Sequence, residues 1–196
     1  MPKEKNVKEE ILKKANLLFA KYGYDKTTMD DIADAVGKRK GALYYYFSTK
    51  EDVFTEVIER EISFLKEQVF ESTKQQKNSK DMLRAYVLTR YRMLSKVANF
   101  YKTFKEDYYK KFDFVQNLRK KYDKEEESFI EQILKEGVEK GELKDVDVTV
   151  TAESFVIAMK GFEYGWSNET NFGNIEKVIT AMLNIFFYGI SKKEHK

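Results

Sequence analysis

The chain has 196 residues, of which 42% are hydrophobic and 15% aromatic, with one proline and no cysteine. A chain of this length can bury one sizeable core, and the lack of cysteine excludes disulfides and thiolate metal ligands. No stretch approaches the roughly 20 consecutive apolar residues of a membrane span, and the N-terminus lacks the apolar segment of a secretory signal. We therefore expect a cytoplasmic protein.

The formal net charge of +3 is unevenly distributed. Residues 1–50 contain 11 Lys and Arg against 7 Asp and Glu, an excess of +4. The rest of the chain contains 25 against 26, an excess of −1. A polyanionic partner would therefore bind at the N-terminal end.

The first predicted elements are two helices. Apolar residues recur at a period near 3.6 over residues 11–22, and Gly23 follows as the cap of this helix. Thr28 and Asp31 have the spacing of a capping box, which predicts a short helix over residues 29–36.

Gly37 ends the second helix, and a third is predicted from about Lys40. Ser48 and Glu51 form a second possible capping box before a long helix with apolar residues at helical spacing through Val69. The later helices are predicted over residues 82–99, 125–140, 152–166 and 175–191, with an aromatic segment at 100–122, polar loops at 72–80 and 167–174, and a loop at 145–151 leading into a helix. The predicted fold class is all-α.

A window without acidic residues carries the sequence GKRKGALYYYF from Gly37. If Leu43 and Phe47 face the core, a rotation of about 100° per residue turns Gly41 and Tyr45 to the opposite side, together with the small Ala42. The outer face of this helix therefore carries small residues and one long aromatic side chain, Tyr45.

Two short helices joined by a tight glycine turn form a helix-turn-helix. Small outer residues let such a helix enter a major groove about 12 Å wide. Lys38, Arg39 and Lys40 lie at its leading end, where base edges are read, and the hydroxyls of Tyr44 and Tyr46 can reach phosphates. The alternative is a solvated basic turn beside half-buried tyrosines.

The run YGYDKTTMDDIADAV, followed by GKRKGALYYYFSTKEDVF, closely resembles the N-terminal DNA-binding domain of TetR-family transcriptional regulators, over about residues 8–55. The resemblance implies a three-helix DNA-binding domain at residues 1–50 and a larger helical effector-binding and dimerisation domain at 51–196. It also implies that Thr28 and Lys50 contact phosphates. The predicted DNA-binding residues are Thr28, Lys38, Arg39, Lys40, Gly41, Ala42, Tyr44, Tyr45, Tyr46 and Lys50.

This chain departs from the family at two positions of the turn. Lys38 and Arg39 stand where the family usually has valine and then serine or threonine. The usual side-chain cap of the third helix is thus absent, and positive charge is gained where the helix meets the groove. We interpret the change as altered or stronger DNA contact; the alternative is tolerated drift in a turn.

The dense aromatic residues after Asn99 favour an effector pocket, since tyrosine supplies both apolar surface and a hydroxyl; an ordinary core is the alternative. The predicted ligand-binding residues are Tyr91, Phe100, Tyr101, Phe104, Tyr108, Tyr109, Phe112 and Trp166. The family fold implies that the two last helices pair with a second subunit; a monomeric core is the alternative. The predicted dimer-interface residues are Phe155, Met159, Phe162, Ile179, Met182 and Phe186.

We expect no enzyme. The single histidine, His195, lies in a charged tail, and the sequence has no phosphate-binding glycine loop or metal-ligand spacing, so no cofactor or metal is predicted. The predicted function is a homodimeric repressor that a small apolar or aromatic ligand releases from a palindromic operator. The alternatives are a DNA-binding regulator controlled by a protein partner, and a helical module whose basic turn binds an acidic protein.

Overall fold

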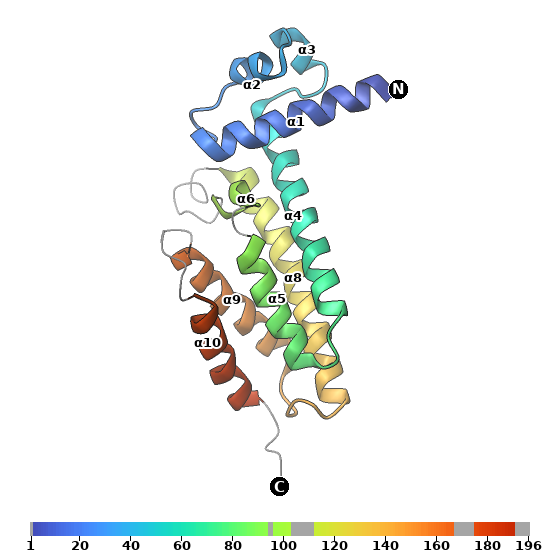
Figure 1. Cartoon of the computed structure of the whole chain (residues 1–196), viewed down its shortest axis with the longest axis vertical. Helices are drawn as coiled ribbons and strands as arrows, with labels where there is room; N and C mark the ends of the chain where they lie inside the picture. Colours follow the sequence, from blue (N-terminus) through green and yellow to red (C-terminus); the bar gives the residue numbers. More distant parts are fainter. Residues whose placement is uncertain (1, 94–95, 103–111, 167–174, 191–196) are drawn as a thin grey trace. The chain divides into compact units, whose positions relative to one another are not determined.

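The computed structural model describes residues 2–93, 96–102, 112–166 and 175–190 (Figure 1). The regular elements in these ranges are all α-helices, which confirms the predicted fold class. Within the same ranges, no helix has the length and apolar character to cross a membrane.

The chain divides into two compact units, which we describe separately. The first unit comprises Met1–Ser63 and Lys96–Val115, and the second comprises Phe64–Ser95 and Gln116–Lys196. The first unit contains the expected DNA-binding domain, residues 1–50, and adds chain segments that we had assigned to the effector domain. The helices are α1 (Pro2–Tyr22), α2 (Met29–Val36), α3 (Lys40–Tyr44), α4 (Lys50–Lys74), α5 (Ser79–Met93), α6 (Ala98–Lys102), α8 (Asp113–Glu139), α9 (Val148–Trp166) and α10 (Ile175–Ile190).

The core of the first unit begins on the apolar face of α1. The side chains at its centre are Ile11, Leu12, Ala15 and Phe19, all nearly inaccessible to solvent. The predicted face extended to Tyr22, but this residue is 51% exposed, with the Lys21 ammonium 4.8 Å from its ring centroid. Tyr24, beyond the turn at Gly23, is buried instead.

An aromatic cluster lies around Tyr24. Its ring centroid is 4.9 Å from that of Phe54 on α4, and 4.9 Å from that of Phe112. Phe19 and Phe114 complete the cluster, with centroid distances to Tyr24 of 6.1 and 5.7 Å. Aromatic pairs at these separations stabilise a fold by more than the burial of their apolar area alone. The cluster therefore holds α1, α4 and the start of α8 together within this unit.

The capping box of α4 lies one residue later than predicted. The Asp52 amide donates to Thr49 Oγ1 at 3.0 Å, and the Thr49 amide donates to Asp52 Oδ2 at 2.8 Å. The prediction of Ser48 and Glu51 was wrong because two overlapping pairs share the same spacing. In the structure α4 begins at Lys50, so the residue before it, Thr49, is the capping residue and Asp52 is its partner.

Two helices of the second unit begin earlier than predicted because Asn78 and Asp147 cap them. Asn78 Oδ1 accepts from the Asp81 amide at 2.9 Å, so α5 begins at Ser79 instead of residue 82. Asp147 Oδ1 accepts from the Val150 amide at 3.0 Å, so α9 extends into the segment that we predicted as a loop.

The end of α8 packs tightly against the start of α5. A Cβ atom placed on Gly137 would lie 2.7 Å from Ser79 Oγ and 2.7 Å from Leu143 Cδ1. The carbonyl of Gly137 accepts from the amides of Glu142 and Leu143, and Glu142 Oε2 accepts from the Ser79 amide at 2.7 Å. Gly141, with φ of 73°, makes the turn that follows α8, close to the helix end predicted at residue 140.

Candidate nucleic-acid interface and effector pocket

Helix α2 is held at its N-terminus by Thr28. The Asp31 amide donates to Thr28 Oγ1 at 3.1 Å, the Thr28 amide donates to Asp31 Oδ2 at 2.8 Å, and the Thr28 hydroxyl donates to the same carboxylate at 2.7 Å. These bonds from the Thr28 side chain and backbone hold the pKa of the Asp31 carboxyl below its ordinary value. Thr28 is exposed, so the capping residue also lies at the surface that the sequence assigned to DNA.

Gly37 turns the chain between α2 and α3. Its φ is 67°, in the left-handed region that side chains disfavour, and its amide bonds back to the carbonyls of Ala33 and Asp34. Nothing lies within 4 Å of the Cβ that a larger residue would add. The backbone conformation, and not a lack of space, therefore explains the glycine here.

Leu43 of α3 and Phe47, three residues beyond the end of α3, face the core as the helical wheel predicted. Leu43 is fully buried and Phe47 is 4% exposed. Gly41 and Ala42 are exposed, and Tyr45 is 73% exposed. A Cβ at Gly41 would meet open space, so the outer surface of the helix is unobstructed.

The three tyrosines after Leu43 differ in placement. Tyr44 is 44% exposed and is the last residue of α3, so Tyr45 and Tyr46 lie in the turn that follows. Tyr46 is half-buried, and its ring packs edge-on against that of Tyr45 with centroids 5.1 Å apart. The sequence alone did not place Tyr45 outside the helix.

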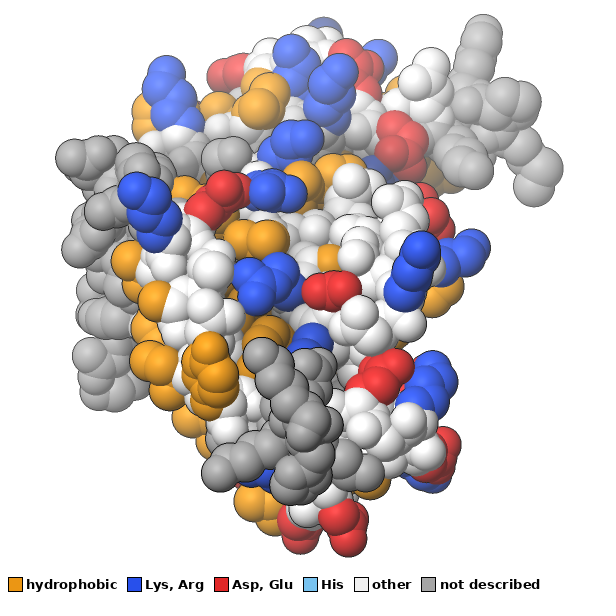
Figure 2. Space-filling model, turned by 60° about the horizontal axis from the view of Figure 1, so that its bottom comes forward, with side chains coloured by type: hydrophobic (Ala, Val, Ile, Leu, Met, Phe, Trp, Pro, Cys, Tyr) orange, Lys and Arg blue, Asp and Glu red, His pale blue; other side chains and the backbone are white. Residues whose placement is uncertain are grey.

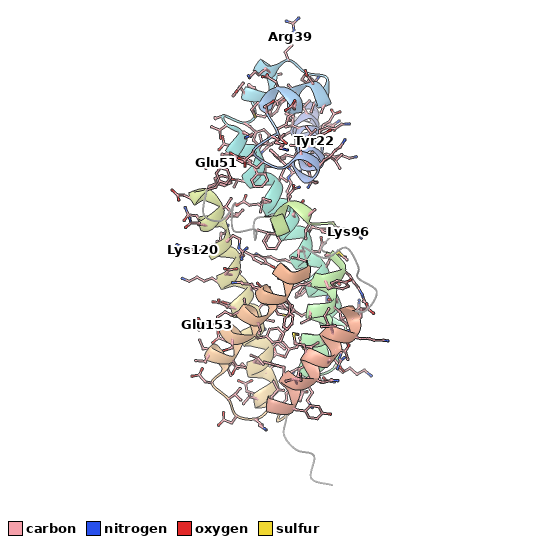
Figure 3. All side chains as sticks on the ribbon, turned by 90° about the vertical axis from the view of Figure 1, so that its left-hand side faces the viewer. Tyr22, Arg39, Glu51, Lys96, Lys120 and Glu153 are labelled. Atoms are coloured by element: carbon pink, nitrogen blue, oxygen red, sulfur yellow. The ribbon has the colours of Figure 1, made fainter. Side chains whose placement is uncertain are left out.

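The three bases of the turn are not equivalent. Arg39 is the N-cap residue of α3, makes no side-chain cap bond, and projects outward in Figure 3. Lys38 is also exposed, whereas Lys40 Nζ donates to Asp30 Oδ2 on α2 at 2.8 Å. This hydrogen bond raises the pKa of the Lys40 ammonium. Since Lys40 neutralises Asp30, the excess positive charge at this surface comes from Lys38 and Arg39.

Lys50 is bound within its own unit. Its Nζ donates to the carbonyl oxygen of Tyr24 at 2.8 Å and lies 4.2 Å from the centroid of the Tyr24 ring. Burial raises the pKa of the Tyr24 hydroxyl. Lys50 therefore positions the α1–α2 connection against the start of α4, a role that the sequence did not indicate.

Three of the predicted ligand-binding residues have side chains within the described part of the chain. Phe100 is fully buried in the first unit, and Phe112 joins the aromatic cluster there. Tyr91, at the end of α5, is half-buried in the second unit. The remaining candidates, whose side chains lie outside the described residues, are Tyr101, Phe104, Tyr108, Tyr109 and Trp166.

The second unit contains a groove of about 280 Å³ between α4, α5 and α8. The described residues that line it are Lys66, Val69, Phe70, Tyr86, Tyr122, Glu125, Glu126 and Phe129. Four aromatic rings and two carboxylates thus share one groove, which we call the α4–α8 groove. The sequence gives no signal for this groove because its residues are far apart in the chain: Lys66 and Glu125, which form an ion pair, are 59 positions apart.

A network of buried polar groups, centred on Arg90, includes three of the residues that line the α4–α8 groove: Tyr86, Tyr122 and Glu126. The Arg90 guanidinium pairs with the Glu126 carboxylate, and both side chains are at most 3% exposed. Arg90 also donates to the hydroxyl of Tyr122, and the hydroxyl of Tyr86 donates to Glu126. These bonds satisfy groups whose burial would otherwise be costly, and they fix the orientation of two of the groove's rings.

The predicted dimer residues lie mostly on the inner side of α9 and α10. Phe155, Met159 and Ile179 are at most 3% exposed within the second unit itself, so a partner could cover them little further. Phe162, Met182 and Phe186 are half-buried. The large apolar side chains exposed on these helices are Val150, Ile157, Val178, Ile185 and Tyr188. Figure 2, turned so that the bottom of Figure 1 comes forward, shows hydrophobic side chains at the surface.

Comparisons with known proteins agree with this architecture. The chain is 31% identical over 193 residues to the HTH-type transcriptional regulator QacR of Staphylococcus aureus, covering 95% of this chain and all of that one. A solved regulator of the TetR/AcrR family from Thermobifida fusca is 26% identical, with a TM-score of 0.73 over 90% of this chain and 95% of its own. The structure of AibR, in complex with isovaleryl coenzyme A and operator DNA, is 22% identical and shares the fold, with a TM-score of 0.69 over 91% of this chain and 97% of its own.

Residues 11–57 match the sequence model for "Bacterial regulatory proteins, tetR family". This span contains the whole of α2 and α3 and the capping boxes described above. Relatives of this kind are DNA-binding regulators and not enzymes. The full-length relative, the matching N-terminal segment and the helix-turn-helix geometry together show that this chain belongs to the TetR family of transcriptional regulators.

Proposed function

We propose that this regulator is a homodimeric repressor that a small ligand releases from a palindromic operator. The observation that carries the proposal is the outer surface of α3, where Gly41 and Ala42 leave the backbone unobstructed and Lys38 and Arg39 provide uncompensated positive charge. A surface of this kind fits the phosphate-lined major groove.

Each predicted DNA contact has a distinct role in the proposal. Tyr45 reaches base edges or thymine methyl groups, since it is the long, exposed side chain beside the small ones. Arg39 and Lys38 approach the groove from its edge. The remaining predicted contacts, which the proposal assigns to phosphates or to groove contact, are Thr28, Lys40, Tyr44, Tyr46 and Lys50.

Measuring DNA binding by fluorescence anisotropy tests these roles, with a duplex from upstream of the protein's own gene and a random duplex. We expect Tyr45→Ala to lower mainly the discrimination between the two duplexes, measured as the ratio of the affinity for the upstream duplex to that for the random duplex. Lys38→Ala should weaken both complexes about equally and lower the slope of log affinity against log salt by about 1. The exposed Lys96 lies outside the predicted contacts, so Lys96→Ala serves as the control. Equal loss of discrimination in Tyr45→Ala and Lys38→Ala would contradict the assignment.

The α4–α8 groove is the candidate effector site. Its four rings and few polar groups are typical of small-molecule pockets, and the similar fold of AibR was solved with both an acyl coenzyme A and operator DNA. Effector binding could change DNA affinity only by the difference in its affinity for two conformations. A compound that raises the melting temperature and also dissociates the operator complex would support a ligand-controlled repressor; control by a protein partner predicts no such compound.

The exposed apolar faces of α9 and α10 are the candidate dimer interface. Ile185 and Tyr188, three positions apart on α10, are 76% and 85% exposed, and contiguous exposed apolar surface is typical of interaction sites. Sedimentation equilibrium should show a dimer that Ile185→Asp converts to a monomer. Leu17→Asp, at an equally apolar position of α1 that is 59% exposed, should leave the dimer intact. A monomeric wild-type protein would reject the assignment.

A further inference from the structure

We propose that Arg39 selects a guanine in each half of the operator, by donating two hydrogen bonds to O6 and N7 of that base in the major groove. The proposal rests on the DNA-binding role assigned to α3 above, and it names one base that this surface reads and the side chain that reads it. Lys38, the neighbouring exposed cation, contacts phosphate instead.

Hydrogen bonds fix the backbone on both sides of Arg39. The Lys38 amide donates to the Ala33 carbonyl at 2.9 Å, and the Ala42 amide donates to the Arg39 carbonyl at 2.9 Å. Arg39 itself has the extended conformation of an N-cap residue, with φ of −72° and ψ of 146°. Its side chain therefore starts from a defined point at the leading end of α3, the part of such helices that contacts base edges.

The Arg39 side chain has no partner within the part of the chain that the structure describes. It is exposed, makes no cap bond to α3, and projects outward in Figure 3. Two carboxylates of α2 are already engaged: Asp30 accepts from Lys40, and Asp31 belongs to the capping box with Thr28. The guanidinium of Arg39 therefore keeps its donors available for a ligand.

Arginine and lysine present different donors to DNA. The guanidinium is a rigid planar fork that matches O6 and N7 of guanine with two parallel hydrogen bonds. The ammonium of lysine lacks this fork, and it binds phosphate as a point charge. Of the two exposed cations in the turn, Arg39 is therefore the one suited to select a base, and Lys38 the one suited to add affinity without selection.

The outer surface of α3 lets the helix come close enough for this contact. Gly41 and Ala42 are exposed, and a Cβ at Gly41 would have nothing within 4 Å. The major groove is about 8.5 Å deep, so bulky outer side chains would hold the backbone away from the base edges. The small residues bring the backbone toward the groove, and the long side chain of Arg39 covers the distance that remains.

Selection from a duplex library with a randomised centre identifies the bases that the full-length protein reads. We expect wild type to select a palindrome with a guanine at the same position of each half, and Arg39→Ser to lose this guanine but keep the other selected positions. Serine can cap α3, so the melting temperature of Arg39→Ser should equal or exceed that of wild type, which excludes unfolding as the cause. Lys38→Ser is the matched control, and it should bind more weakly but select the wild-type sequence.

Base analogues then locate the contact on the guanine, with affinity measured by fluorescence anisotropy. Placing 7-deazaguanine at both positions removes N7 and should weaken wild-type binding about ten-fold, with no effect on Arg39→Ser. Hypoxanthine removes only the amino group in the minor groove and should change neither affinity. Arg39→Lys should keep the salt dependence of wild type but lose most of the discrimination against 7-deazaguanine, because it keeps the charge without the fork.

The outcomes separate this inference from the proposed function. Loss of the selected guanine in Arg39→Ser, with a 7-deazaguanine effect confined to wild type, supports the inference. If Arg39→Ser selects the wild-type sequence and binds all duplexes more weakly, Arg39 contacts phosphate, and the guanine assignment is overturned while operator binding stands. A selected palindrome without a guanine common to both halves, or an equal effect of 7-deazaguanine on both proteins, would overturn it in the same way. If wild type selects no sequence at all, the inference and the proposed repressor both fail.

Discussion

The α2–α3 turn of the first unit and the α4–α8 groove of the second use charged side chains in opposite ways. The first unit keeps Lys38 and Arg39 at the surface, on a turn where neighbouring residues in the sequence are neighbours in space. The second unit buries Arg90 against Glu126, 36 positions away in the chain. The comparison shows that the surface proposed to face DNA is encoded locally, whereas the groove with its buried ion pair requires helices brought together from distant parts of the chain.

The largest expected loss of stability comes from breaking the buried Arg90–Glu126 ion pair of the second unit. Arg90→Met leaves the buried Glu126 without its cation, and we expect a loss of about 3–5 kcal/mol in the free energy of unfolding. The matched change in the first unit is Arg60→Met, which removes exposed pairs with Glu9 and Glu56 and should cost about 1 kcal/mol or less. Urea unfolding monitored by circular dichroism measures both.

A second substitution tests whether the loss at Arg90 comes from uncompensated charge. Adding Glu126→Gln to Arg90→Met should restore part of the stability, because the buried carboxylate is then neutral. Similar losses for Arg90→Met and Arg60→Met would show that the buried pair is no more important than a surface one.

Glycine to alanine substitutions should have opposite effects in the two units. Gly137→Ala places a Cβ within 2.7 Å of Ser79 and Leu143, and we expect a loss of stability of about 1–3 kcal/mol. Gly41→Ala meets open space within a helix, so stability should stay the same or rise by up to about 1 kcal/mol.

For DNA affinity we expect the larger loss in Gly41→Ala and not in Gly137→Ala. Gly41→Ala adds a methyl group to the surface proposed to enter the major groove and should weaken operator binding roughly ten-fold, within the range of losing one good base contact. Gly137→Ala should bind operator normally at temperatures where it stays folded. Thermal melts and anisotropy titrations on both variants provide the comparison, and unchanged operator affinity in Gly41→Ala would count against close approach of the backbone.

The smallest expected effect at neutral pH concerns Glu61, a buried carboxylate of the first unit. Its oxygens accept from Asn16 Nδ2 at 2.9 Å, Asn99 Nδ2 at 2.9 Å and the Phe100 amide at 2.7 Å. Burial raises the pKa of Glu61 above its ordinary value near 4.5, although these three bonds oppose the shift. The native state therefore holds this proton to a higher pH than the unfolded chain does.

The sign of the pH dependence follows from that difference. The proton on Glu61 stabilises the native state most below about pH 4.5, and this stabilisation is lost as the pH rises through the raised pKa. We expect the stability of wild type relative to Glu61→Gln to fall over that window. Glu59→Gln, at an exposed position of the same helix, should show no such trend. A difference that grows with rising pH would contradict the assignment.

The sequence alone predicted much of the first unit because its signals are local. The capping residue Thr28, the turn at Gly37 and the burial of Leu43 depend on neighbours within a few positions, and the structure shows all three. The same local pattern was ambiguous at the start of α4, where two capping boxes overlap and the structure chose Thr49. The sequence also suggested three exposed positive charges at this turn. In the structure, the charge of Lys40 is paired with Asp30.

Tertiary structure alone decided the features that depend on several helices. Apolar periodicity identifies the inner face of a helix, and the residues that it indicated on α9 and α10, Phe155 and Ile179, are buried within the second unit. The exposure of Ile185, on which the proposed dimer interface rests, became visible only in the structure. Aromatic density pointed to Phe100, which is fully buried in the first unit, and to the half-buried Phe112, which packs against Tyr24 there. The α4–α8 groove depends on side chains dozens of positions apart, and their meeting is fixed by how whole helices pack, which no local pattern of residues encodes.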